Sequence, residues 1–456
     1  MNCTSSETAP VIETLMLRLL RRLSPIVLAV AAAACGGGGG GGGGQPAPPP
    51  AAPAPAPAPP PAPEVADTSP YVTGATYADA LRRCTYAGSA TQACSMAELP
   101  FLGMETGAVT LDDVMSRTLV SETWMGDNLR TALQALPPDL IALFGSITAV
   151  VIATDVRPAY YDPNTGAIYL DPDFLWLTVA QRNQVPDTPD PRSDFGRDLS
   201  FVMPWRYVRN NQPLTVFLNQ DGSRDPDQIV EILGFLLYHE LAHAVDFMPP
   251  AKMTGLAPSL TVLQAINTGA PLSSSFVNTY PLTSQVIRDL AAVSFLGETA
   301  TATQRNLLPE DLVDEFANDG ATQYYAYTTQ YEDFATLFET VMMKWRFGYD
   351  KDTAIASPSS TGSSADAVIA WGERGRIGAL QVMTRALDVG QRMYPGDLAA
   401  FESFLTGQPA PVQMTAGRTW GQNLVLAPVA ATAGEARGIS RETRTPDYFL
   451  ERVTIR

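Results

Sequence analysis

The two histidines of this 456-residue chain stand four positions apart, in the segment His239-Glu240-Leu241-Ala242-His243. Residues at i and i+4 of a helix lie one turn apart on the same face, so two imidazoles with this spacing can bind one Zn²⁺. Because the sequence contains no third histidine, any further protein ligand must be a residue of another type. The spacing therefore predicts a helix that carries part of a zinc site.

The glutamate after the first histidine is suited to proton transfer. On a helix, Glu240 would point beside the metal and toward a metal-bound water. A carboxylate there can take the proton of that water and pass it to the leaving amine of a peptide bond. The alternative is a pair of structural histidines on an ordinary helix. The apolar surroundings argue against it, because burying these three polar side chains without partners would be costly.

The third ligand does not come from the patterns that commonly follow this motif. The metzincin pattern requires glycine and histidine where this chain has Asp246 and Pro249. The thermolysin-like pattern requires a nearby downstream acid, and no acid occurs between Asp246 and Asp289. The best remaining candidate is Glu332, on a predicted amphipathic helix that also carries its main rival, Glu339.

Two other groups with ligand chemistry have different expected roles. Asp246 lies one turn past His243, too close on the same helix to bind the metal comfortably, and we expect it to orient a histidine. Cys84 and Cys94 are ten residues apart in a chain with an export signal, so they predict a disulfide rather than a zinc site.

The two elements together resemble a known family. The segment H-E-L-A-H-A-V-D at 239–246, with E-D-F-A at 332–335, is similar to the anthrax lethal factor-like and Pro-Pro endopeptidase-like zinc metallopeptidases. Their pattern is H-E-h-x-H-x-h-D followed by E-x-F-A-E-x-F. The resemblance implies a gluzincin-type site in which Glu332 completes the zinc ligands His239 and His243.

The resemblance also implies an oxyanion-stabilising tyrosine seven residues before the third ligand. Tyr325 stands there, and Tyr324 or Tyr327 could serve instead. The chain departs from the family pattern in two ways. Thr336 replaces an acid of the second element, and the long spacer after the first element permits an inserted subdomain.

The overall charge limits the choice of partners. The chain has 47 acidic and 30 basic residues, which give a net charge of −17. Binding to nucleic acid requires basic surface, so we expect no nucleic-acid partner. The sequence does not reveal the oligomeric state.

The N-terminal region predicts export and a lipid anchor. Residues 1–35 have basic residues, a short apolar run and small residues before Cys35, which is typical of a signal peptide with a lipobox-like cleavage site. The start is Met1 or Met16, and ordinary secretion without lipid is the alternative. Residues 36–69 are rich in Gly, Pro and Ala and predict a disordered tether. We therefore expect an outer-membrane lipoprotein of the bacterial cell envelope.

The remainder, residues 70–456, is expected to be one α+β, zincin-like domain, mostly helical with a small mixed sheet and an active-site helix that carries the histidine motif. Periodicity and capping signals predict helices at 111–136, 228–247, 331–347 and 367–405, a strand at 146–153 and a hairpin turn at 163–166. The hairpin near 167–170 could be the edge strand on which an extended peptide is bound.

These features together predict a zinc-dependent endopeptidase that hydrolyses a protein or peptide substrate at or near the bacterial cell surface. Two alternatives remain open. The protein could be a non-catalytic zinc-binding surface lipoprotein, or it could hydrolyse cell-wall peptide cross-links. Cleavage specificity depends on pocket walls that the sequence does not assemble.

Overall fold

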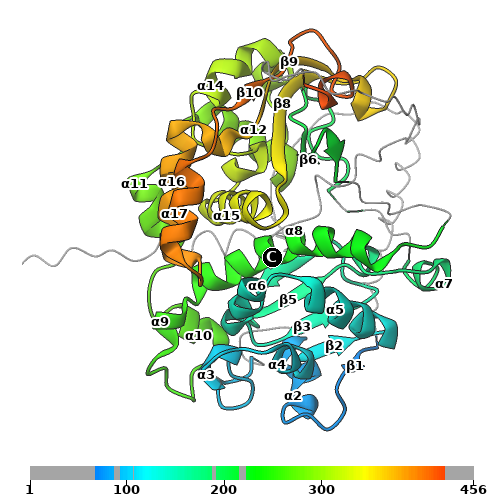
Figure 1. Cartoon of the computed structure of the whole chain (residues 1–456), viewed down its shortest axis with the longest axis vertical. Coiled ribbons are helices and arrows are strands. Elements are labelled where there is room, and N and C mark those ends of the chain that lie inside the picture. Colours follow the sequence, from blue (N-terminus) through cyan, green and yellow to red (C-terminus); the bar gives the residue numbers. More distant parts are fainter. Residues whose placement is uncertain are drawn as a thin grey trace, which may run out of the picture. The chain divides into compact units, whose positions relative to one another are not determined.

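The structure, a computed structural model, describes residues 67–86, 93–105, 107–186, 190, 192–214 and 222–426. The signal segment, Cys35 and nearly all of the tether lie outside the described residues. The described part has an α+β fold, as the sequence predicts, but its strands form two five-stranded sheets rather than one small sheet (Figure 1).

The first sheet is mixed. Its strands, in spatial order, are β1 (Ser69–Pro70), β2 (Thr118–Val120), β3 (Val150–Ile152), β5 (Ala167–Leu170) and β4 (Tyr160–Asp162). β2, β3 and β5 are parallel to one another, whereas β1 and β4 run antiparallel to their neighbours. Because it is last in the spatial order, β4 forms one edge of this sheet.

The second sheet is antiparallel throughout. Its strands, in spatial order, are β10 (Val412–Gln413), β9 (Val368–Arg374), β8 (Asp350–Ser357), β6 (Trp205–Arg209) and β7 (Gln212–Pro213).

The helices differ widely in length. They are α2 (Ala78–Thr85), α3 (Leu102–Glu105), α4 (Leu111–Ser116), α5 (Thr123–Ala135), α6 (Pro138–Leu143), α7 (Val179–Arg182), α8 (Pro226–Phe247), α9 (Pro250–Met253), α10 (Val262–Ile266), α11 (Leu272–Thr279), α12 (Gln285–Leu296), α13 (Ala302–Arg305), α14 (Val313–Ala317), α15 (Gln330–Phe347), α16 (Leu380–Met393) and α17 (Leu398–Thr406).

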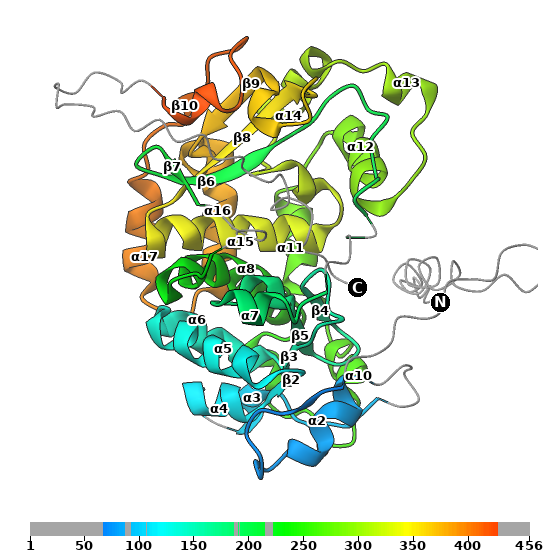
Figure 2. The same cartoon turned by 90° about the vertical axis from the view of Figure 1, so that its right-hand side faces the viewer.

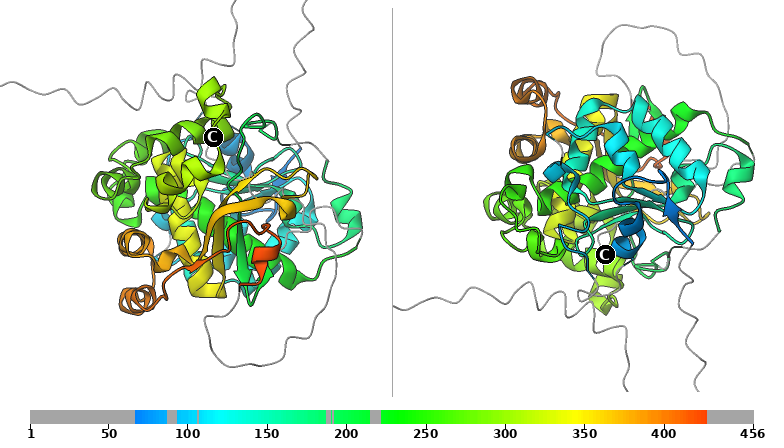
Figure 3. Two further views of the ribbon diagram at one scale, coloured as in Figure 1. Left: turned by 90° about the horizontal axis from the view of Figure 1, so that it is seen from above. Right: turned by 90° about the horizontal axis from the view of Figure 1, so that it is seen from below.

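The two longest helices, α8 and α15, pack side by side between the two sheets (Figures 1 and 2). On one side α8 contacts β4 of the first sheet and the helices α5 and α6. On the other side α15 contacts β8 of the second sheet. α16 packs on α15, and α17 packs on α16 (Figure 3). A helix covered on all sides must be apolar around its whole circumference, which explains the composition of α8.

Local sequence fixes the ends of both helices. Pro226 opens α8, where the side chain of Gln228 accepts the N–H of Asp225 at 2.8 Å. α15 ends at Gly348, whose φ of 72° lies in the left-handed region that glycine adopts at helix ends. The helices predicted at 228–247 and 331–347 are thus confirmed to within a few residues.

Other predicted elements are correct only in part. The turn at 163–166 does join β4 to β5, and 146–153 contains β3. The helical prediction at 111–136 is confirmed for α4 and α5 but is wrong at 118–120, where β2 pairs with β3. The helix predicted at 367–405 is wrong over 368–374, which forms β9 beside β8.

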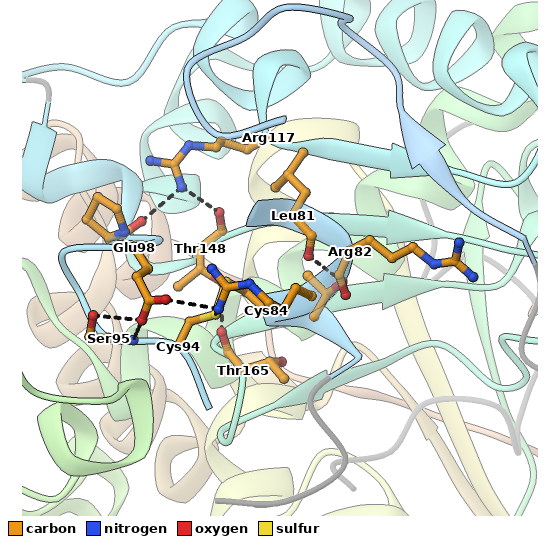
Figure 4. Close-up of a disulfide and its surroundings, with 12 residues drawn as sticks. Leu81, Arg82, Cys84, Cys94, Ser95, Glu98, Arg117, Thr148 and Thr165 are labelled. Atoms are coloured by element: carbon orange, nitrogen blue, oxygen red, sulfur yellow. Dashed lines mark hydrogen bonds and ion pairs between the residues drawn. A yellow bond between two sulfur atoms is a disulfide. The ribbon is translucent and has the colours of Figure 1, made fainter. Parts of the chain in front are cut away.

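The predicted disulfide is present between Cys84 and Cys94. Both cysteines are buried against the outer face of the first sheet, in an apolar cluster with Leu119 and Val151. Figure 4 shows the bridge next to Ser95, whose backbone N–H donates to the carboxylate of Glu98 at 2.9 Å. The bridge therefore joins α2 to the segment that leads to α3.

We expect removal of this bridge to lower stability without changing the fold. A disulfide across ten residues stabilises a protein by about 2–3 kcal/mol, mainly by restricting the unfolded chain. The double variant Cys84→Ala/Cys94→Ala should lose about that amount in urea unfolding, and wild type treated with a reductant should behave alike. Equal midpoints for oxidised and reduced wild type would contradict this role.

Candidate metal centre

Helix α8 places the three residues of the histidine motif in the interior. His239, Glu240 and His243 are all buried, and the Nε2 atoms of the two imidazoles are 3.1 Å apart. One helical turn between the histidines brings the rings together, as their spacing predicts. Both Nε2 atoms lie near the first turn of α15.

That first turn supplies Glu332. The hydroxyl of Thr329 accepts the N–H of Glu332 at 3.1 Å, which fixes the start of α15. The Oε2 atom of Glu332 is 3.1 Å from Nε2 of His239 and 3.4 Å from Nε2 of His243. These three residues are the candidate metal ligands that the described part of the chain brings together.

The donor set fits a zinc ion. Ligand atoms about 2.0–2.1 Å from a tetrahedral zinc are separated from one another by about 3.3 Å. The three donor–donor distances, 3.1, 3.1 and 3.4 Å, are close to this value. Two imidazoles and one carboxylate are also a ligand set that zinc commonly takes at sites where a fourth position is left for water.

The electrostatics of the cluster favour a cation. Burial alone would lower the pKa of His239, but Glu332 and Glu339 overcome this effect and raise that pKa to about 10. Burial disfavours ionisation of Glu332, yet the two histidines bring its pKa below its usual range. An imidazole that retains its proton so strongly lies in a negative environment, and the same environment attracts a metal cation.

Glu240 lies beside the ligands but is not one of them. Neither of its carboxylate oxygens makes a hydrogen bond of good geometry within the described part of the chain. Burial raises its pKa to about 8, while His239 and the backbone N–H of Tyr161 on β4 oppose the shift. A buried carboxylate with so little hydrogen bonding is costly, and a nearby water would supply a further donor.

Glu339, the rival ligand, contacts the other nitrogen of His239. Its Oε2 accepts from Nδ1 of His239 at 3.1 Å. With a proton on Nδ1, the other ring nitrogen, Nε2, can offer its lone pair to a metal. Its Oε1 accepts from Nζ of Lys351 at 2.9 Å and from the hydroxyl of Tyr207. Glu339 therefore orients a ligand. Glu339 is thus an orienting acid in this site, even though position 336, where the resembling metallopeptidases have glutamate, is Thr336.

Asp246 does not form the predicted bond to a histidine. Its Oδ1 accepts the backbone N–H of Ser273 at 2.7 Å, which links α8 to the start of α11. The Oδ2 atom of Asp246 and Nδ1 of His243 are both buried without a hydrogen-bond partner among the described residues. Burial raises the pKa of Asp246 to about 7.

The three tyrosines of η5 (Tyr324–Tyr327) have separate partners. The hydroxyl of Tyr325 donates to Oε1 of Glu332 at 3.0 Å. Tyr324 and Ser294 share a hydrogen bond of 3.1 Å, and Tyr327 donates to Asp319 at 3.0 Å. Among these three, Tyr325 is the residue that contacts the metal-ligand set.

Sequence reasoning missed Lys351 and Tyr207. Lys351 lies in β8 and is buried, with its ammonium 4.4 Å from the centre of the Trp205 ring. Its pKa falls because of burial, although Glu339 opposes the shift. A single lysine between two aspartates in a strand carries no local signal for this role, because the contact depends on how β8 packs on α15.

Scans against protein-family models, curated proteins and solved structures find no match to this chain. Within its described residues, none of the helices has the length and apolar composition needed to cross a membrane.

The arrangement predicts graded losses of zinc. Glu332→Ala removes a ligand and should leave little zinc after dialysis against a weak chelator. Glu339→Gln removes an orienting charge and should weaken zinc binding by about 10- to 100-fold. Glu310→Ala, at an exposed acid, should bind as wild type does. Metal analysis and competition with a chromogenic chelator measure these effects, and undiminished zinc in Glu332→Ala would exclude Glu332 as a ligand.

Proposed function

We propose that this protein is a zinc-dependent endopeptidase. The observation that carries the proposal is the convergence of His239, His243 and Glu332 beside the buried carboxylate of Glu240. A closed structural zinc site has four protein ligands and no use for an adjacent base. Three candidate ligands beside a carboxylate with little hydrogen bonding of its own favour a site that activates water.

The proposed mechanism assigns one role to each group. When bound, zinc would polarise the scissile carbonyl and acidify a water. Glu240 is placed to take a proton from the attacking water and to pass it to the leaving nitrogen. Tyr325, now hydrogen-bonded to Glu332, is positioned to turn its hydroxyl toward the developing oxyanion.

The first sheet offers a place for the peptide backbone. The hairpin near 167–170 was expected to supply the edge strand, and within it β5 lies between β3 and β4 and is not the edge. β4, the first strand of this hairpin, is one edge of the first sheet, and it packs against α8. An extended substrate that pairs with β4 would pass beside Glu240, which supports a peptide substrate.

We further propose that the enzyme acts at the bacterial cell surface. The support is the sequence before the domain, in which a lipid on Cys35 and the tether at 36–69 would hold the domain away from a membrane.

The role of Glu240 gives a direct test. Glu240→Gln should retain zinc, because Glu240 is not a ligand, and should lose at least about 100-fold in kcat on a peptide library, because the base is absent. Peptide hydrolysis and metal content are measured on the same samples. Hydrolysis that is unchanged in this variant, or absent from wild type, would refute the peptidase proposal.

The role of Tyr325 gives a second test. Tyr325→Phe should lower kcat by about 100-fold or more and change KM little, because the hydroxyl acts mainly on the transition state. Zinc binding should persist, since both histidines and Glu332 remain. Tyr327→Phe serves as the control. Tyr327 lies in the same turn as Tyr325, but its hydroxyl is bonded to Asp319 and not to a candidate ligand. Equal effects of the two substitutions on kcat would exclude a specific role for Tyr325.

A further inference from the structure

A cavity of about 360 Å³ lies next to the candidate site. Its walls come from residues 195–205, α12, η5 and the loop between β8 and β9. These segments are far apart in sequence and meet in the half of the domain that contains the second sheet (Figure 1). The volume falls within the range of sites that bind small ligands or single side chains, roughly 300–1,000 Å³.

Tyr325 joins this cavity to the metal centre. Its ring forms part of the cavity wall, and its hydroxyl donates to Glu332 at 3.0 Å. Phe295 of α12 packs edge-on against the ring at 5.0 Å between centroids and holds it in place. The cavity therefore begins within one side chain of the metal ligands.

The chemistry of the walls is selective. None of the residues that line the cavity carries a charge, although the chain has a net charge of −17. Six of the lining residues are aromatic: Phe195, Phe201, Trp205, Phe295, Tyr324 and Tyr325. The hydroxyls of Ser294 and Tyr324 are bonded to each other. A charged group that entered would meet no opposite charge, whereas an aromatic group would gain contact area and ring pairing.

We propose that this cavity is a specificity pocket for a large uncharged side chain, aromatic or branched aliphatic, of a residue that flanks the scissile bond. The inference rests on the proposed peptidase function. A carbonyl within reach of the Tyr325 hydroxyl places the neighbouring side chain of the substrate beside the Tyr325 ring. The pocket then selects substrates by size and by absence of charge.

Binding and catalysis can be tested separately. The zinc-loaded Glu240→Gln protein is titrated calorimetrically with peptides that differ at one position only, where Phe, Gly or Asp is present. The Phe peptide should bind at least about 10-fold more tightly than the other two. Equal affinities would overturn the pocket. A preference for Phe with no hydrolysis by wild type would refute the peptidase proposal and leave the pocket as a binding site.

Two further substitutions alter the cavity wall in the active enzyme, which retains Glu240. Phe295→Ala should lower kcat/KM for the Phe peptide by roughly 10- to 200-fold and affect the Gly peptide much less. Val202→Asp adds a charge to the wall and should shift the preference from Phe toward Lys or Arg. Val286→Asp is the matched control, because both valines are 38% exposed and Val286 lies outside the cavity. An unchanged preference in both wall variants would exclude the pocket.

Discussion

The structure depends on how charge is balanced between α8 and α15. Three glutamates are buried next to His239: Glu240, Glu332 and Glu339. Lys351 adds one buried ammonium to this set. Three carboxylates and one ammonium leave two negative charges, and uncompensated charge is very costly in a protein interior. Protons can supply the compensation, as the raised pKa of His239 indicates. A divalent cation supplies both charges at one point, beside the imidazole nitrogens that would bind it.

The rest of the domain holds this arrangement in place. The first sheet and α5 and α6 support α8, while the second sheet and α16 support α15. Close packing at Gly234 brings the helices together, because a side chain there would collide with the ring of Phe347. On the far side of α15, Arg385 of α16 forms a buried ion pair with Asp333, the residue next to Glu332. Each candidate ligand therefore rests on an element that is itself fixed by long-range contacts.

The sequence was informative where the signals are local. The histidine spacing, the caps of α8 and α15 and the turn before β5 can each be recognised within about twenty residues, and the structure contains all of them. Glu332 required elimination of nearby acids together with a family resemblance, because it lies 93 positions from His239. β2 and β9 were not recognised, since their pairing partners, rather than their own residues, determine that they are strands. Lys351 was not recognised for the same reason.

The division of the ligands between two helices has a consequence for folding. A metal held by His239, His243 and Glu332 would be a cross-link between distant parts of the chain, comparable in kind to the bridge between Cys84 and Cys94. That disulfide closes ten residues, whereas the metal would close 93. Since the entropy lost by an unfolded chain grows with the length of the closed loop, the ion would restrict more of the chain than the covalent bond does. Metal binding would then stabilise the packing of α8 on α15, in addition to any role in catalysis.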